Sequence, residues 1–335
     1  MALPLISILT PFKNTSAYLD DCLLSIINQS YKNWELVIVD DHSTDSSYDI
    51  VKQWAEEDAR IKLFRNTGSG IIEALRHAFH ESQGTLITRM DSDDIMYSNK
   101  LEHMAGQLLD SGFGHVALGQ VQYFGDDGIS EGYSKYEHWL NKLTERGSNY
   151  TEIYKECVIP SPCWMVYRED LERCGAFFPD RYPEDYDLTF RFYENDLKCI
   201  PSDQLLHRWR DYPNRTSRTH VHYAQNYFLD IKLKYFLKLN HDPSRELTVW
   251  GAGFKGKTIA QSLVKAGVPF FWICDNPNKI GKTIYDQVML PFHALKDLSN
   301  PQSIITVANE EAQSAIRKHL QEWQMKPMQD YFFFC

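Results

Sequence analysis

The sequence has no long apolar run, no paired cysteines and no excess of basic residues, and each absence excludes a class of protein. No stretch of its 335 residues approaches the ~20 apolar residues that a membrane-spanning helix needs. Its seven cysteines are scattered, which argues against a zinc site or a disulfide framework and predicts reduced thiols in the cytoplasm. Because 35 basic residues face 45 acidic ones, for a net charge of −10, a broad nucleic-acid-binding surface is not expected.

The composition of the sequence is that of a globular protein, with 43% hydrophobic and 24% charged residues. The length fits one large or two ordinary domains. The apolar start, MALPLISILTPFK, lacks the basic segment and cleavage site of a signal peptide, so we expect a core strand there.

Apolar segments alternate with amphipathic ones over the first hundred residues. The segments 5–9, 35–39, 61–64 and 85–88 read as buried strands, and the alternation predicts an α/β fold with a doubly wound, mostly parallel sheet. Ligands of such sheets bind beyond the carboxyl ends of the strands. Polar residues follow all four strands, namely Thr10 and Pro11, Asp40 to Ser43, Asn66, and Asp91 to Asp94.

A second, smaller α/β pattern begins after the polar segment 240–244, which predicts a linker. A glycine-rich turn with Gly251, Gly253 and Gly256 follows a short strand, and Asp275 stands at the end of the next strand, as in dinucleotide-binding units. We therefore predict a Rossmann-like domain over 245–335. Two interpretations of it stay open: a phosphate bound at the glycine turn, or a structural, oligomerising or regulatory module.

Three carboxylates lie close together in Asp91, Asp93 and Asp94. Like charges so near one another repel, and a divalent cation relieves that cost. Mg²⁺ and Mn²⁺ prefer oxygen ligands and often bridge carboxylates to phosphates. The alternative is an acidic turn that caps the helix expected from Ser98. After the second strand, we expect Asp45 to cap a helix and Asp40 or Asp41 to touch a ligand.

Several segments resemble, in the order of the family, the family 2 glycosyltransferases of the GT-A type. They are ISILTPFKNTSAYLDDCLLSIINQSYKNWELVIVDDHSTDSS, RNTGSG, MDSDD, CVIPSPCWMVYREDLERCGAF and PEDYDLTFRFYENDLKCIPSDQLLHRWRDYPNRTSRT. The resemblance covers roughly 3–225 and implies a GT-A type, Rossmann-like domain over 1–240. Its nucleotide-sugar half would be about 1–110 and its acceptor half about 111–240.

The resemblance also implies roles for individual residues. The acid that reads the nucleobase is Asp41, with Asp40 as a close alternative, and Asp185 takes the position of the general base. The other residues implied at the nucleotide are Thr10, Pro11, Lys13, Asn66, Gly70, Arg89, Asp91 and Ser92. The implied ligands of Mn²⁺ or Mg²⁺ are Asp91, Asp93 and, as a further candidate, His207. The acceptor or the donor diphosphate would meet Glu184, Arg208, Trp209 and Arg210.

Other interpretations of these residues stay open. Glu184 and Asp187 fit the first turn of a helix, where the dipole favours acids, and His207 fits a structural hydrogen-bonding histidine. Processive members of the family carry a QxxRW motif, but the spacing from Gln204 to Arg208 and Trp209 is one residue too long. A single-addition enzyme is therefore expected.

The chemistry of sugar transfer agrees with these residue types. A metal and arginines can neutralise a leaving diphosphate, and a carboxylate can accept the proton of an acceptor hydroxyl. We expect a metal-dependent, inverting glycosyltransferase of polysaccharide biosynthesis that uses a nucleotide-sugar, foremost a UDP-sugar, and a glycan or glycolipid acceptor. A peripheral contact with a membrane and a homo-oligomer formed through the C-terminal domain stay open.

Three alternatives compete with this expectation. A nucleotidyltransferase would need a glycine-rich loop after the first strand, and residues 10–14 contain no glycine. A non-catalytic regulator that binds a nucleotide-sugar would use the C-terminal domain as its effector site. An NAD-dependent oxidoreductase built on that domain would lack a partner catalytic domain.

Overall fold

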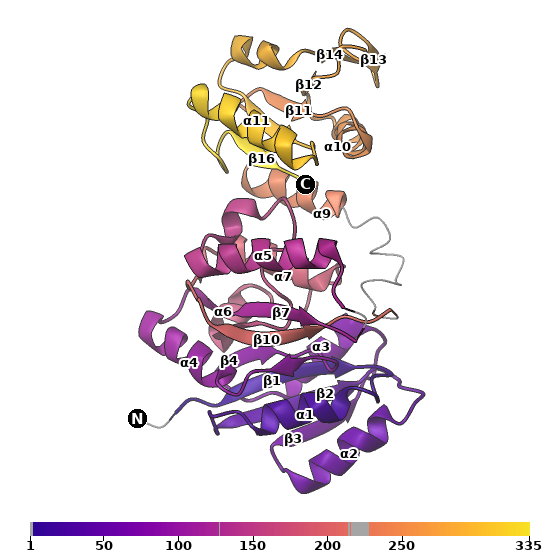
Figure 1. Cartoon of the computed structure of the whole chain (residues 1–335), viewed down its shortest axis with the longest axis vertical. Coiled ribbons are helices and arrows are strands. Elements are labelled where there is room, and N and C mark those ends of the chain that lie inside the picture. Colours follow the sequence, from indigo (N-terminus) through magenta and orange to yellow (C-terminus); the bar gives the residue numbers. More distant parts are fainter. Residues whose placement is uncertain (1–2, 127, 214, 216–227) are drawn as a thin grey trace. The chain divides into compact units, whose positions relative to one another are not determined.

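The computed structural model describes residues 3–126, 128–213, 215 and 228–335. They form two compact units, one made of Met1–Tyr150 and Val158–His220 and the other of Thr151–Cys157 and Val221–Cys335. Each unit is an α/β structure with its own main sheet (Figure 1). The division at 240–245 stays a prediction, and helix α9 (Leu229–Leu239) lies in the second compact unit. The end of the resembling segment, 216–225, lies outside the described residues.

The main sheet of the first unit has seven strands in the order β3-β2-β1-β4-β8-β6-β9. Strands β1 to β4 are parallel, whereas β8 runs antiparallel to both β4 and β6. Every residue of β1 and β2 is buried, which explains their continuous apolar sequence. The strands are β1 (Ile6–Phe12), β2 (Trp34–Asp40), β3 (Ile61–Arg65), β4 (Leu86–Arg89), β6 (His115–Leu118), β8 (Trp164–Tyr167) and β9 (Lys198–Cys199).

Helices flank this sheet, and α3 packs against β1 and β2. In α1, α3 and α4, apolar residues at spacings of three and four make up most of the buried face. The helices are α1 (Leu19–Ile27), α2 (Ser47–Glu57), α3 (Ile71–Glu81), α4 (Lys100–Ser111), α5 (Glu131–Arg146), α6 (Arg168–Arg173) and α7 (Glu184–Glu194), with the 3₁₀ turn η1 at Asn149–Glu152.

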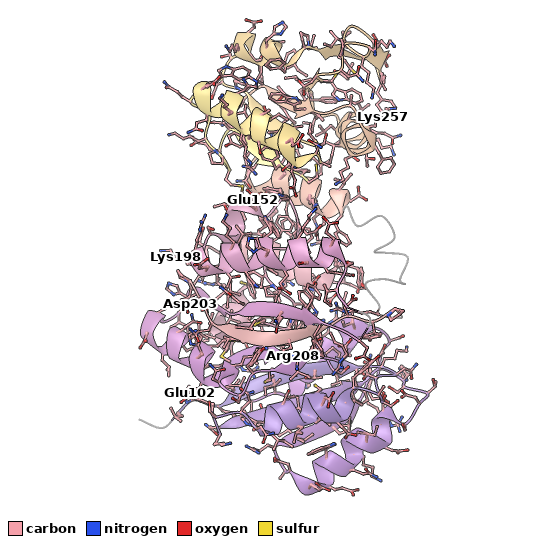
Figure 2. The ribbon with its side chains drawn as sticks, viewed as in Figure 1. Glu102, Glu152, Lys198, Asp203, Arg208 and Lys257 are labelled. Carbon is pink, nitrogen blue, oxygen red and sulfur yellow. The ribbon has the colours of Figure 1, made fainter. Side chains whose placement is uncertain are left out.

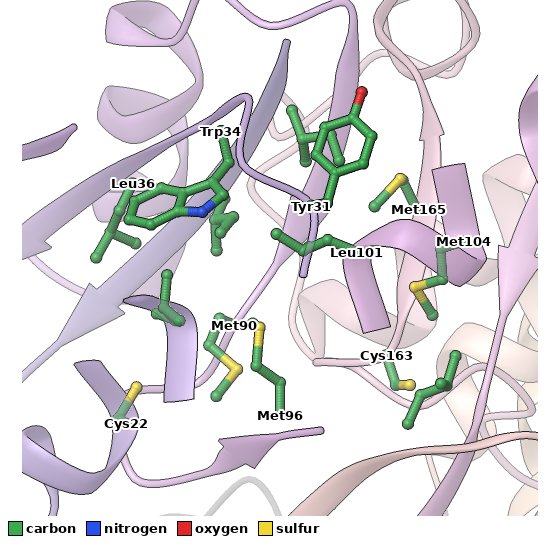
Figure 3. Packing of buried hydrophobic residues seen from close by; sticks show 14 of the residues in the cluster. Cys22, Tyr31, Trp34, Leu36, Met90, Met96, Leu101, Met104, Cys163 and Met165 are labelled. Atoms are coloured by element: carbon green, nitrogen blue, oxygen red, sulfur yellow. The ribbon is translucent and has the colours of Figure 1, made fainter. Parts of the chain in front are cut away.

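A second, three-stranded sheet brings a late part of the first unit against the acidic loop Asp91–Asp94. In it, β10 (Leu205–Arg210) pairs antiparallel with β5 (Ile95–Met96) and parallel with β7 (Gln120–Phe124). Both ends of the acidic loop are anchored, because Met90 and Met96 are buried in the hydrophobic core. Figure 3 shows both methionines within this cluster.

The second unit contains a six-stranded sheet in the order β13-β14-β12-β11-β15-β16. All its strands are parallel except the edge strand β13. The strands are β11 (Leu247–Trp250), β12 (Phe271–Ile273), β13 (Thr283–Ile284), β14 (Gln287–Leu290), β15 (Gln302–Ile305) and β16 (Tyr331–Phe333). The other helices of this unit are α10 (Phe254–Lys265), α11 (Glu310–Glu322) and the 3₁₀ helix η3 (Phe292–Asp297). In the described part of the chain, no helix is long and apolar enough to cross a membrane.

Packing accounts for two of the three glycines in the turn between β11 and α10. Gly251 has a φ of +128°, and a Cβ there would lie 2.4 Å from Oγ1 of Thr306. A Cβ on Gly256 would lie 2.1 Å from the carbonyl oxygen of Gly251. A Cβ on Gly253 would meet nothing within 4 Å. Close packing is therefore enough to explain glycine at positions 251 and 256, without a bound phosphate.

We predict that Gly256→Ala destabilises the second unit by about 1–3 kcal/mol or more, because the added methyl group overlaps a backbone oxygen that cannot move freely. The measurement is the midpoint of urea unfolding followed by tryptophan fluorescence. The matched control is Gly253→Ala, which should cost at most about 1 kcal/mol since its methyl group enters open space. Equal losses in the two variants would contradict this account of the turn.

Candidate active site

The carboxyl ends of β1, β2, β3 and β4 meet at one edge of the main sheet of the first unit. The register fixes this arrangement, since Phe12 of β1 lies beside Asp40 of β2 and Asp40 lies beside Arg65 of β3. Polar residues that are far apart in the sequence are thereby collected along one rim, the position at which α/β sheets bind ligands.

Asp41 is the centre of one corner of this rim. Its Oδ1 accepts hydrogen bonds from Nδ2 of Asn66 and from the backbone N–H of Gly70, each at 2.8 Å. Nζ of Lys13 lies 3.5 Å from Oδ2 of the same carboxylate. Gly70 has a φ of +93°, a conformation that glycine adopts without strain. The structure thus brings together four of the residues expected at the nucleotide.

Asp40 and Thr10 lie deeper than Asp41. Oδ1 of Asp40 accepts a hydrogen bond from the backbone N–H of Ser43 at 2.9 Å. Among the described residues, neither Oδ2 of Asp40 nor Oγ1 of Thr10 has a hydrogen-bond partner, and both atoms are buried. Pro11 is buried beside them in β1. This geometry favours Asp41 over Asp40 as the acid that faces a ligand.

Asp45 lies one residue before Ser46, which is the N-cap residue of α2 and has no side-chain cap hydrogen bond, so Asp45 supports the start of the helix without occupying the expected cap position. Burial opposes its ionisation, but hydrogen bonds from Ser47 and Ser16 prevail and lower the pKa of Asp45 to about 2. Its Oδ1 accepts from the backbone N–H of Ser47 at 3.0 Å. Asp45 is therefore part of the scaffold behind the rim.

The acidic loop is the second feature of the rim. Oδ2 of Asp93 accepts a hydrogen bond from the hydroxyl of Tyr212 at 2.9 Å. Burial and the neighbouring charge of Asp94 raise the pKa of Asp93 to about 7, and burial raises the pKa of Asp94 to about 8 against the opposing charge of Arg215. The hydroxyl of Ser92 pairs with that of Thr15 at 3.0 Å. A cation bound here would relieve the repulsion between these acids.

A chain of buried hydrogen bonds supports the acidic loop from behind. Nζ of Lys100 donates to the carbonyl oxygen of Pro162 at 2.6 Å and lies 3.1 Å from Nδ1 of His207. Nε2 of His207 lies 2.9 Å from Oδ2 of Asp94. Burial and the charge of Lys100 lower the pKa of His207, so the neutral ring accepts from Lys100 and donates to Asp94. Since both ring nitrogens have partners, the geometry favours the structural interpretation of His207.

The remaining residues of β10 differ in role. Trp209 is buried and stacks on Tyr123, with ring centroids 5.0 Å apart. Arg210 braces the acidic loop, because its Nε donates to the carbonyl oxygen of Asp93 at 2.7 Å. The guanidinium carbon of Arg208 lies 4.2 Å from the ring centroid of Phe124, and Figure 2 labels Arg208 on β10.

Glu184 and Asp185 begin α7, and Arg89 connects them to the acidic loop. Nη1 of Arg89 donates to Oε1 of Glu184 at 2.9 Å, and its Nε donates to Oδ1 of Asp91 at 3.0 Å. Burial and the charge of Glu184 raise the pKa of Asp185 to about 7, against the opposing charge of Arg89. Asp187 instead pairs with Arg191 at 2.7 Å and is part of the scaffold.

Sequence reasoning did not assign Lys100, Tyr212 and Arg215 to the site. Arg215 is buried, and although burial lowers its pKa, the charges of Asp94 and Asp93 outweigh that effect and raise it. Arg215 follows His207, Arg208 and Arg210 closely in the sequence, whereas nothing in the sequence marks Lys100 as buried. In the part of the chain that the structure describes, no three His, Cys, Asp or Glu side chains are placed to hold a metal ion. Asp91 and Asp93 still fit a hard cation, which often takes one or two carboxylates and completes its shell with substrate phosphates and water.

Comparison with known proteins identifies the class. The family model of glycosyl transferase family 2 matches residues 7–175, about half of the chain, and the chain belongs to this family. The resemblance seen in the sequence and the predicted GT-A fold are both confirmed.

Particular relatives agree with this class. Over 167 residues, 50% of this chain and 63% of the relative, the chain is 39% identical to the putative teichuronic acid biosynthesis glycosyltransferase TuaG of Bacillus subtilis. The first curated relatives are matched over 48% and 63% of their own length.

Two solved structures share the fold. S. aureus TarS 1-349 in complex with UDP-GlcNAc has a TM-score of 0.54 at 19% identity, over 71% of this chain and 68% of that one. The mannosyltransferase PcManGT from Pyrobaculum calidifontis, in complex with GDP-Man and Mn²⁺, has a TM-score of 0.53 at 19% identity, over 79% and 75%.

We predict that His207→Leu lowers the free energy of unfolding by at least about 2 kcal/mol, because it leaves the buried Lys100 and Asp94 without their shared partner. Urea denaturation measures the loss. His80→Leu, at an exposed histidine of α3, is the control and should change stability by less than about 0.5 kcal/mol. An unchanged midpoint in His207→Leu would show that the buried chain contributes little.

Proposed function

We propose that this protein is a metal-dependent, inverting glycosyltransferase that moves a sugar from a nucleotide-sugar to a hydroxyl group. One observation carries the proposal: the rim of the first unit holds the Asp41 corner and the acidic loop, and Arg89 connects that loop to the start of α7, where Asp185 lies. A nucleoside, a diphosphate with its metal, and an acceptor hydroxyl each need one of these groups. Membership of glycosyl transferase family 2 supports the proposal.

The nucleotide-sugar donor is proposed to bind along the rim from β1 to β4. Asp41, held by Asn66 and Gly70, would accept a hydrogen bond from a base, while Lys13 offers a positive charge beside it. The other donor-side residues are Thr10, Pro11, Asp91 and Ser92. A UDP-sugar is our first choice because TarS is known with UDP-GlcNAc, and the GDP-Man complex of PcManGT makes GDP-sugars the second choice.

Asp91 and Asp93 are the residues proposed to hold Mn²⁺ or Mg²⁺, and Mn²⁺ accompanies the donor in PcManGT. When bound, such an ion supplies positive charge that stabilises a leaving diphosphate. Arg208 is proposed to add to this charge from β10. Arg210 contributes by fixing the backbone of Asp93, to which it already donates.

Asp185 is the proposed general base. Its Oδ1 accepts a hydrogen bond from the backbone N–H of Tyr186 at 2.7 Å, which fixes the carboxylate. A pKa of about 7 suits a group that takes a proton from a hydroxyl near neutral pH. The deprotonated hydroxyl attacks the anomeric carbon opposite the leaving diphosphate, so one displacement inverts that centre.

The acceptor class is proposed from the relatives. TuaG carries a name from teichuronic acid biosynthesis, which supports a glycan or glycolipid acceptor in polysaccharide biosynthesis. All seven cysteines are free thiols, which supports a cytoplasmic site of reaction. A nucleotidyltransferase or a non-catalytic regulator remains the alternative, and release of sugar from a nucleotide-sugar by the purified protein would contradict the regulator.

We predict that Asp185→Asn lowers kcat/KM about 10²–10⁴-fold, because the amide cannot accept the hydroxyl proton. In the wild type, kcat/KM should rise with pH and level off above an apparent pKa near 7, since the ionised carboxylate is the active form. Rates of transfer measured from pH 5 to 9 give both results. Glu194→Gln, at the far end of α7, is the control and keeps the wild-type profile. Unchanged turnover in Asp185→Asn would remove Asp185 from this role.

We predict that a nucleotide and Mn²⁺ stabilise the protein together more than either does alone. A thermal-shift panel of UDP, UDP-GlcNAc, GDP and GDP-mannose, each with Mn²⁺ or with EDTA, ranks the donors, because a ligand at 100 times its Kd adds about 2.7 kcal/mol. Asp93→Asn should lose the dependence on Mn²⁺ while Asp41→Asn loses the response to the nucleotide. The absence of a metal-dependent shift with all four ligands would contradict the proposed function.

A further inference from the structure

Arg89 occupies an unusual position for a residue expected to touch a nucleotide. It is the last residue of β4, and its side chain is only 5% exposed. Its guanidinium faces two acids from separate parts of the chain: Asp91 in the acidic loop, through Nε and Nη2, both 3.0 Å from Oδ1, and Glu184 at the start of α7. A guanidinium turned toward protein carboxylates on two sides has little surface left for a ligand.

Arg89 compensates the negative charge of the acids around it. Asp91, Glu184 and Asp185 all lie near this one cation, and the carboxylate of Glu184 is buried. Among the described residues, Oε2 of Glu184 has no hydrogen-bond partner, so the bond from Arg89 to Oε1 is its main compensation. Arginine stays protonated at every working pH, so it provides a fixed charge.

We propose that Arg89 is a positioning residue that couples the donor side of the site to the base side by holding Asp91 and Glu184 together, and that it does not bind the nucleotide. The inference rests on the proposed function, since it gives Arg89 a place in that reaction. It differs from the role that the family resemblance implies for this position.

The coupling has a specific consequence for the base. Without Arg89, the buried charge of Glu184 would stand uncompensated beside Asp185, and the negative charge would oppose ionisation of Asp185. Asp91 would lose its side-chain contact with Arg89, but its backbone stays held, since its carbonyl oxygen accepts a hydrogen bond from the backbone N–H of Asp94 at 3.3 Å. The chemical step should therefore suffer, while the nucleoside contacts at the Asp41 corner stay intact.

The test compares Arg89→Met, Glu184→Gln and the double variant for Mn²⁺-dependent UDP binding, followed by calorimetry, and for turnover of UDP-GlcNAc and GDP-mannose. We expect Arg89→Met to lower kcat about 10²-fold or more while the Kd of UDP changes less than about threefold. Adding Glu184→Gln to Arg89→Met should restore at least about tenfold in kcat, since it removes the uncompensated charge. Arg89→Lys keeps the positive charge but lacks the planar guanidinium that contacts two acids at once, so its kcat should lie between those of the wild type and Arg89→Met.

Arg60→Met is the matched control. Arg60 also pairs with an acid, Asp58 at 2.6 Å, but it lies at the amino-terminal end of β3, whereas the rim is formed by the carboxyl ends of the strands. It should leave both kcat and Kd unchanged. If Arg89→Met raises the Kd of UDP more than tenfold at unchanged kcat, or if Glu184→Gln fails to restore the rate, the inference is wrong while the proposed function stands. If the wild type neither binds UDP nor turns over either donor, the proposed function fails and the inference fails with it.

Discussion

Clustered negative charge at the rim is the constraint on which the rest of the first unit depends. Asp91, Asp93 and Asp94 are within one short loop, and burial raises the pKa values of Asp93 and Asp94. Such a loop needs cationic and hydrogen-bonding support from outside itself. The second sheet supplies it, because β10 places His207, Arg210 and, just beyond its end, Arg215 against the loop. The pairing of β5 with β10 is thus as important to the site as the main sheet.

The same constraint explains why two neighbouring acids differ so much in role. Asp94 is fully buried and has its oxygens bound by His207 and the backbone of Arg210, so it belongs to the support. Asp91 is partly exposed and contacts Arg89, so it stays available at the rim. A similar division separates Asp187, paired with Arg181 and Arg191, from Asp185.

Sequence patterns sufficed for the features that depend on local order. Continuous apolar strands predicted the parallel sheet, and the residues after each strand predicted the rim, because register collects strand ends automatically. Patterns could not show which side chains turn inward. The family resemblance implies a ligand role for Arg89, and the sequence left His207 open between a metal ligand and a structural histidine. The structure pairs both side chains with buried acids. The burial of Lys100 depends on tertiary packing that no local spacing encodes. The sequence likewise left the role of the glycines in 251–256 open, since close packing and phosphate binding both favour glycine.

A net negative charge and the binding of an anion are compatible in this chain because a few arginines lie next to the acidic loop, where their charge is needed. A net charge of −10 would repel a nucleotide diphosphate at a random surface, and the Debye length of about 8 Å at physiological salt limits the reach of that repulsion. Close to the acidic loop, the side chains of Arg89, Arg210 and Arg215 offset part of this negative charge, since all three face its carboxylates or backbone. Neutralised from behind in this way, the loop can present Asp91 and Asp93 to a cation without first having to overcome the full repulsion between its own charges.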